Sequence, residues 1–220
     1  MASAAIEQAR FNMVEQQIRP WEVFNPQVLD LLAELPREEF VPPAYRGLAY
    51  ADLEIPLPNG QRMLSPCLVA KLLQALALAP GERVLEVGSG SGFVTACLAR
   101  LGGRVTSLEL DPVLSALTAS HLERVGVSGV EQLTGDLFHT ELAPRSFDAI
   151  ALTGAVRELP EELIRLLDDH GRIFAVLGEE PIMQAFQIQR NSDGTLRHQV
   201  LFDTLIPSLK QPQQQRKFIF

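Results

Sequence analysis

The arrangement of hydrophobic and polar residues changes near residue 80 of this chain. Beyond that point, short apolar runs alternate with segments whose apolar residues recur every three or four positions, the pattern of strands alternating with amphipathic helices. This alternation indicates an α/β fold with a parallel sheet and right-handed crossovers. Strands are predicted at 83–87, 104–109, 130–134, 147–152 and 172–178, with helices at about 91–101, 112–125 and 160–168.

The end of the chain follows a different pattern. Residues 184–190 alternate polar and apolar side chains, residues 191–194 form a turn cluster, and residues 200–202 resume an apolar run. These features predict an antiparallel hairpin at the edge of the sheet. Residues 211–220 are rich in glutamine and predict a polar tail.

The first 80 residues lack the strand–helix alternation. Between residues 40 and 58, prolines are frequent and favour extended or turn conformations. We expect residues 1–80 to form an N-terminal helical extension on a core domain of residues 81–210. Helices are predicted at 4–18 (ended by Pro20), 26–34 and 66–79.

Composition narrows the class of protein. A length of 220 residues suits one domain with a small extension. The net charge of −8 argues against general affinity for nucleic acid or an anionic membrane. An apolar stretch of about 18 residues and a signal-peptide core are both lacking, so we expect a cytoplasmic protein. Two cysteines suit a reducing compartment, and four scattered histidines predict no metal site.

The most informative residues follow the strand predicted at 83–87. Glu86 precedes Gly88, Gly90 and Gly92 in the pattern acid-x-Gly-x-Gly-x-Gly. Glycine is required where a ligand approaches the backbone closely or where φ is positive. The dinucleotide fingerprint G-x-G-x-x-G would need a glycine at position 93, which is Phe93. The turn therefore resembles that of S-adenosylmethionine (SAM) dependent methyltransferases, although a glycine turn that binds nothing remains an alternative.

Two further acids follow the next strands. Glu109 ends the strand predicted at 104–109, where nucleotide-binding α/β folds place an acid that accepts hydrogen bonds from both ribose hydroxyls. Asp136 follows the strand predicted at 130–134. In methyltransferases of this type, the acid of that turn lies near the adenine amino group. Three turns with suitable groups at the carboxyl ends of strands favour a cofactor site there.

Other parts of the chain resemble the protein-L-isoaspartate O-methyltransferase family. The resemblance runs from about residue 11 to residue 178, and more weakly from 202 to 207. It implies a seven-stranded class I methyltransferase fold, SAM as methyl donor with S-adenosylhomocysteine as product, and isoaspartyl residues of damaged proteins as acceptors. The residues that carry it are 13–18 (MVEQQI), 28–30 (VLD), 36–42 (PREEFVP), 49–52 (AYAD) and Gly60-Gln61.

The resemblance also implies a set of site residues. On the acceptor side we expect Asp52 and Arg62 to contact substrate and Ser65 to be the catalytic candidate. The acceptor walls are expected at 52–58 and 60–66, with the chain after residue 153 opposite. The expected cofactor-binding residues are Met63, Leu64, Glu86, Gly88, Ser89, Gly90, Gly92, Glu109, Leu110, Asp136, Leu137 and Thr153.

One segment departs from the family pattern Gly-Gln-Thr-Ile-Ser-x-Pro, whose serine is assigned to the active site. Here Leu64 stands at the serine's position and Arg62 at the threonine's. Ser65 supplies a hydroxyl one position later, but it also precedes Pro66 as a typical helix N-cap, so both roles are open. The family's C-terminal Arg-aromatic-Val-Pro-Leu is also altered, at residues 204–208 (TLIPS).

This departure bears on the acceptor more than on methyl transfer. A carboxylate with a pKa near ~4 is ionised at neutral pH, so its methylation needs no general base. Catalysis is then largely positioning. One alternative is a methyltransferase of the same fold with another small-molecule or protein acceptor, for which Arg62 is a natural carboxylate partner. Another is a SAM-binding protein without turnover. The sequence gives no oligomeric state.

Overall fold

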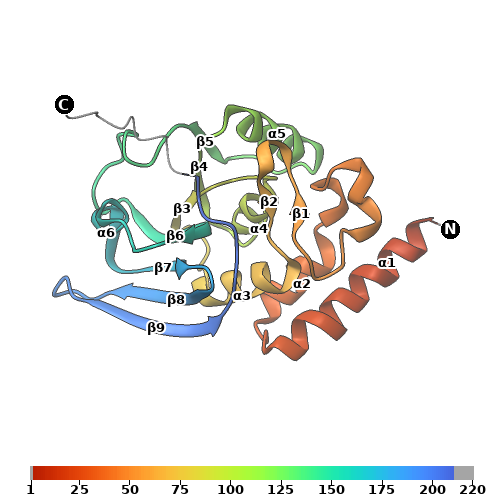
Figure 1. Ribbon diagram of the computed structural model, residues 1–220, viewed down its shortest axis with the longest axis horizontal. Helices are drawn as coiled ribbons and strands as arrows, with labels where there is room; N and C mark the ends of the chain where they lie inside the picture. The colour runs from red at the N-terminus through yellow and green to blue at the C-terminus, as the bar shows by residue number, and fades with distance from the viewer. Residues whose placement is uncertain (1, 211–220) are drawn as a thin grey trace.

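A seven-stranded sheet forms the centre of the computed structural model, which describes residues 2–210 (Figure 1). Its strands follow the order β5-β4-β3-β6-β7-β8-β9. Neighbours from β5 to β7 pair in parallel, and β8 and β9 add an antiparallel edge. The predicted fold class is therefore confirmed. The strands are β3 (Arg83–Val87), β4 (Arg104–Glu109), β5 (Glu131–Thr134), β6 (Phe147–Val156), β7 (Leu167–Glu179), β8 (Ile182–Arg190) and β9 (Leu196–Asp203).

The strand order reverses beside β3. The chain runs outward through β4 and β5, then returns to place β6 against the other side of β3. In doubly wound folds, the crevice at such a reversal is where ligands bind, at the carboxyl ends of the strands. The crossovers contain α4 (Phe93–Arg100), α5 (Pro112–Arg124) and α6 (Glu161–Leu166).

Two predicted boundaries near this crevice were wrong. The helix expected from residue 91 begins at Phe93, because Gly92 has a φ of +81° and cannot continue a right-handed helix. The strand expected to end at residue 152 continues to Val156. Ala155 and Val156 remain paired with β7, and the Ala155 backbone also bonds to Pro207 and Leu209.

The N-terminal helical region differs from a regular helix over 4–18. The helix α1 (Ala2–Asn12) passes into a π-helical segment, η1 (Met13–Ile18), and a 3₁₀ turn, η2 (Arg19–Trp21), that contains Pro20. Met13 and Ile18 are both buried, and they are five positions apart in the sequence. A π turn, with its i→i+5 bonds, brings such a pair onto one face.

Two further helices follow, α2 (Pro26–Glu34) and α3 (Pro66–Leu76). The helix α3 ends before the predicted residue 79, because Ala77 adopts a left-handed conformation with φ +45°. Residues of these helices and of the sheet belong to one hydrophobic core, which includes Leu32, Leu72 and Val84. Between residues 2 and 210, no helix combines the length and apolar character that crossing a membrane requires.

The proline-rich segment between α2 and α3 is made of turns and short extended pieces, as predicted, and two of these pieces pair in a hairpin that the sequence did not predict. It contains the 3₁₀ turns η3 (Arg37–Glu39), η4 (Pro43–Leu48) and η5 (Pro58–Gly60). The hairpin pairs β1 (Ile55–Pro56) with β2 (Arg62–Met63). This hairpin lies beside the carboxyl ends of the sheet strands, so it borders the crevice.

A buried arginine joins this segment to the start of α4, beside the crevice. Arg37 donates from Nε to the Ala49 carbonyl at 2.8 Å and from Nη2 to the Leu64 carbonyl at 2.6 Å. Its guanidinium carbon lies 4.7 Å from the Phe93 ring centroid, at the start of α4. Burial lowers the pKa of Arg37 to about 10. The side chain thus fixes residue 64 relative to the glycine turn.

Candidate cofactor and acceptor site

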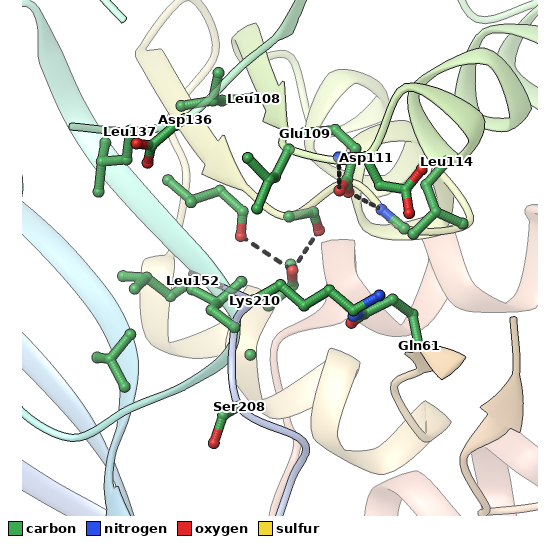
Figure 2. A pocket seen from close by; sticks show the side chains of 18 of the residues that line it. Gln61, Leu108, Glu109, Asp111, Leu114, Asp136, Leu137, Leu152, Ser208 and Lys210 are labelled. Atoms are coloured by element: carbon green, nitrogen blue, oxygen red, sulfur yellow. Dashed lines mark hydrogen bonds between the residues drawn. The ribbon is translucent and has the colours of Figure 1, made fainter. Parts of the chain in front are cut away.

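A cavity of about 360 Å³ opens at the carboxyl ends of the strands (Figure 2). Its lining includes the glycine turn after β3, the end of β4, the turn after β5 and the end of β6. Figure 2 shows Glu109, Asp136 and Leu137 along one side and Gln61 with Lys210 crossing the other. The structure therefore brings together residues from three turns that the sequence singled out.

The backbone conformation of the turn after β3 explains why the sequence has glycine at three of its positions. Gly88, Gly90 and Gly92 all have positive φ values, of +94°, +55° and +81°. A Cβ at Gly88 would lie 2.6 Å from Thr153 Oγ1 and 2.9 Å from Leu209 Cδ2. A side chain at position 88 would therefore displace neighbours at the edge of the cavity as well as strain the backbone.

Glu109 presents an oriented carboxylate to the cavity. Its Oε2 accepts a hydrogen bond from the Gly90 N–H at 2.9 Å, and its Oε1 accepts one from the Asp111 N–H at 3.0 Å. Oε2 also accepts from Ser89 Oγ at 3.4 Å, so the open acceptor position is on Oε1. The backbone thus fixes Glu109 in position and leaves the carboxylate with acceptor capacity for a ligand hydroxyl group.

Asp136 and its neighbours form the far end of the cavity. Asp136 Oδ1 accepts from the Phe138 N–H at 3.2 Å, and Oδ2 lies 2.5 Å from His139 Nδ1. Leu110, Leu137 and Phe138 add apolar surface. An acid beside an apolar slot suits a flat ring with an exocyclic amino group, such as adenine.

Glu86 was expected among the cofactor-binding residues, but its side chain does not line a described cavity. The structure buries its side chain completely beneath the glycine turn, outside the lining of the described cavities. Its Oε2 accepts from Thr95 Oγ1 at 2.5 Å and Ser107 Oγ at 2.7 Å, whereas Oε1 has no partner among residues 2–210. Burial raises the pKa of Glu86 to about 7. The geometry makes Glu86 a support for the turn.

Ser89 and Thr153 secure the same turn from either side. Ser89 is buried and accepts a hydrogen bond from Thr118 Oγ1 at 2.9 Å. Thr153 Oγ1 donates to the carbonyl of Val87 at 3.1 Å or to that of Gly88. Both residues also face a small cavity between β2 and the turn.

Residues 62–64 lie against the glycine turn across this small cavity of about 30 Å³. Met63 and Leu64 are buried, so the family's serine position holds an apolar side chain inside the fold. Arg62 is half exposed at the cavity edge, with Nε 3.9 Å from Glu54 Oε2. Arg62 therefore keeps a guanidinium close to the cofactor cavity with one distant partner.

Of the two roles left open for Ser65, the structure does not show the side-chain N-cap. Ser65 occupies the N-cap position with extended φ and ψ, but its hydroxyl makes no capping bond. Asp52 Oδ1 instead accepts from the Cys67 N–H at 3.0 Å. The Ser65 hydroxyl borders a second cavity, of about 240 Å³, together with Asp52 and Glu54.

A C-terminal segment that the pattern analysis did not assign to the cofactor side completes the first cavity. We call residues 207–210 the strap, the end of the dark blue trace after β9 in Figure 1. The Ala155 N–H donates to Pro207 O at 3.0 Å, and the Leu209 N–H donates to Ala155 O at 2.8 Å. Lys210 Nζ donates to Asn59 O at 2.6 Å. In the sequence, Pro207 and the weak family resemblance around it were the only signs that this segment belongs to the site. Residues 211–220, the expected polar tail, lie outside the described residues.

The strand reversal, the glycine turn and the acids after β4 and β5 together define a SAM-dependent methyltransferase of the doubly wound class. Residues 8–211 match the family model for protein-L-isoaspartate(D-aspartate) O-methyltransferase. The chain belongs to this family. The predicted family and SAM-dependent enzyme class are confirmed.

Individual relatives agree with this assignment. A protein-L-isoaspartate O-methyltransferase of Koribacter versatilis is 36% identical over 199 residues, covering 90% of this chain and 88% of that protein. A second, from Anaeromyxobacter, is 42% identical over 180 residues, covering 81% and 73%. A solved structure from Plasmodium falciparum, named as a putative enzyme of this kind in complex with S-adenosyl-L-homocysteine, has a TM-score of 0.80 at 23% identity. It covers 91% of this chain and 98% of that one, which shows a shared fold.

Proposed function

We propose that this protein methylates the α-carboxylate of L-isoaspartyl residues in polypeptides. The observation that carries the proposal is the arrangement of two cavities between the same two walls. One wall is formed by residues 52–65 and the other by residues 204–210. Two cavities along the same pair of segments suit a polypeptide acceptor, which occupies more of the surface than its methylated carboxylate alone.

The residues of the first cavity fit SAM. We assign the ribose hydroxyls to Glu109, the adenine end to Asp136 and Leu137, and the methionine end to the glycine turn with Met63 and Leu64. The clearest sign of fit is Glu109, whose carboxylate is held by backbone N–H groups at the carboxyl end of β4 and lines the cavity. When bound, SAM supplies an electrophilic methyl group on sulfur.

The chain's own task is to position the acceptor and exclude water. The acceptor carboxylate is already ionised at neutral pH, so it would take the methyl group without first losing a proton. A general base is therefore unnecessary, and alignment supplies most of the rate increase. Arg62 is the proposed partner of the acceptor carboxylate, since an arginine guanidinium can bind both of its oxygens.

Ser65 is the proposed hydroxyl of the site. Asp52 caps α3 in its place, so Ser65 Oγ is left without a hydrogen bond among the described residues. It borders the second cavity on the wall that continues to Arg62. We therefore assign Ser65 to the acceptor, while Leu64 forms part of the apolar floor beside the glycine turn.

The opposite wall differs from expectation. The chain after Thr153 was expected to face the N-terminal segment, and Gly154 with Val156 does contribute. Most of this wall comes from the strap and from Thr204, Leu205 and Ile206 before it. In this proposal, residues 1–80 are an extension that closes the acceptor side of a methyltransferase domain of residues 81–210.

The net charge of −8 favours a polypeptide acceptor over a nucleic acid. The two free buried cysteines suit a reducing compartment such as the cytoplasm. The decisive test is a methyl-transfer assay with radiolabelled SAM. Its substrates are an isoaspartyl peptide and the same peptide with ordinary aspartate. We expect labelling of the isoaspartyl peptide alone, as a base-labile methyl ester. If neither peptide is labelled and small carboxylic acids from a metabolite extract are labelled efficiently, the acceptor is a small molecule and the proposal is wrong.

A further inference from the structure

The second cavity contains a lysine between two aromatic rings. Lys71 projects from α3, and its Nζ lies 5.1 Å from the Phe202 ring centroid and 6.0 Å from that of Trp21. Leu68 and Leu205 add apolar walls. Trp21 and Leu205 are about half exposed, so the groove is open to a ligand. None of the site residues expected from the sequence includes this lysine.

The charge of Lys71 is not neutralised by the acids of the same cavity. Asp52 is engaged as the cap of α3, and Glu54 faces Arg62. Cys67, whose N–H bonds to Asp52, lies one helical turn before Lys71, so Asp52 is held at the amino end of α3. Among residues 2–210, no carboxylate lies within 4.0 Å of Lys71 Nζ, and its contacts are the two rings.

The groove is also held in a fixed geometry. Gln74, on the same helix, donates from Nε2 to Glu22 O at 2.9 Å. Its Oε1 accepts from the backbone N–H groups of Phe24 at 2.7 Å and Asn25 at 3.0 Å. These three bonds fasten the turn after Trp21 to α3, which keeps the indole beside Lys71. A preorganised cation beside apolar surface binds an anion more strongly than a flexible lysine in water does.

We propose that the groove around Lys71 binds an acidic side chain of the acceptor polypeptide near the residue that is methylated. The inference rests on the proposed function for its polypeptide acceptor. Residues 52–65 and 204–210 contribute to the linings of both the groove and the first cavity, so a chain that lies along these two segments passes both. The aromatic and leucine surfaces receive the methylene groups of a glutamate, and the ammonium receives its carboxylate. Lys71 is thus a specificity-determining residue.

Binding can be measured without turnover, because Trp21 is the single tryptophan of the chain and borders the groove. Two isoaspartyl peptides that differ only in flanking glutamates or lysines are titrated while Trp21 fluorescence is followed. We expect the glutamate peptide to bind wild type at least tenfold more tightly. Lys71→Gln should remove most of this preference, and Lys71→Glu should reverse it. Arg104→Glu makes the same charge change at the exposed amino end of β4 and should leave the preference intact.

Equal preference in Lys71→Glu and Arg104→Glu would overturn the inference, since the effect would then be one of net charge. So would equal affinity of wild type for the two peptides. Parallel methyl-transfer assays separate this result from the proposed function. If the glutamate peptide is preferred in a manner that depends on Lys71, but neither peptide is methylated, the proposed isoaspartyl acceptor is wrong and the proposed binding groove stands. If both peptides are methylated with the same kcat/KM and bind with the same affinity, the proposed function stands and the proposed role of the groove is wrong.

Discussion

Asp52 Oδ1 accepts a hydrogen bond from the backbone N–H of Cys67 at 3.0 Å, across fifteen residues of chain. This contact caps α3 from outside the helix. The adjacent Ser65 stands at the N-cap position but contributes only its backbone there. Asp52 therefore provides the side-chain cap of α3, and the Ser65 side chain on the same cavity wall does not take part in it.

The first prediction concerns stability. Asp52→Ala should lower the free energy of unfolding by about 1 kcal/mol, because it leaves a first-turn N–H of α3 without its acceptor. Ser65→Ala should change it by much less. Urea denaturation of the two variants beside wild type measures both effects. A larger loss in Ser65→Ala would mean that the serine hydroxyl caps the helix in solution.

The second prediction concerns the glycine turn. Gly88→Ala should weaken SAM binding at least tenfold, because a Cβ would lie 2.6 Å from Thr153 Oγ1 and 2.9 Å from Leu209 Cδ2. Gly81→Ala is the matched control: its φ of +87° is similar to the +94° of Gly88, but a Cβ there has nothing within 4 Å. The control should lose about 1 kcal/mol of stability from backbone strain and keep its affinity. Calorimetric titration with SAM distinguishes the two, and equal affinities would contradict the prediction.

The third prediction tests the ribose assignment. Glu109→Ala should weaken SAM binding by about 1.5–3 kcal/mol, the usual loss for a hydrogen bond to a charged group. Glu123→Ala removes an exposed acid from α5 and should bind SAM as wild type does. The dissociation constants come from the same titration. Unchanged affinity in Glu109→Ala would place the ribose elsewhere.

The fourth prediction is a pH dependence of stability that Glu86 controls. Burial raises the pKa of Glu86 from 4.5 to about 7, so the native state keeps a proton that the unfolded state has released between these values. The contribution is full below pH 4.5, falls as pH rises, and is lost above pH 7. Glu86→Gln stays neutral and should remove this decline, which is on the order of 3 kcal/mol. Denaturation at pH 5 and pH 8 tests it. A wild-type decline that Glu86→Gln retains would assign the titration to another group.

The sequence pattern singled out those residues of the first cavity's lining that stand where elements end. The glycine turn and Glu109 follow strands whose apolar runs mark their limits, and the carboxyl ends of parallel strands meet at one edge. Glu86 was misplaced for a related reason. A parallel strand is buried on both faces, so its apolar run does not reveal which side chains point to the cavity and which lie beneath it.

Features that depend on tertiary contacts were beyond the sequence pattern. Ser65 satisfies the local rule for an N-cap, yet the acid that caps α3 comes from a preceding loop. The strap forms no helix or named strand, and only its bonds to Ala155 reveal its place. The groove around Lys71 combines residues from η2, α3 and β9, which no short motif can represent.

The last prediction addresses the residue that departs from the family pattern. Leu64 is 5% exposed and packs in the core, so it offers no hydroxyl to an acceptor. Leu64→Ser should restore the family hydroxyl beside the glycine turn and raise turnover on isoaspartyl peptides. Because it removes a buried side chain, it should also lower stability by about 2–5 kcal/mol. Methyl-transfer kinetics and the melting temperature measure the two effects.

Ser65→Ala is the complementary variant. With Asp52 capping α3, the hydroxyl of Ser65 is available to the acceptor, so its removal should lower kcat/KM for the peptide about tenfold, equivalent to ~1.4 kcal/mol. The melting temperature and the affinity for SAM should be nearly unchanged. If the double variant with Leu64→Ser recovers the lost turnover, the two positions supply the same hydroxyl to one site. Full activity of Ser65→Ala alone would show that positioning by Arg62 and the cavity walls is sufficient, since ionised carboxylates need no base.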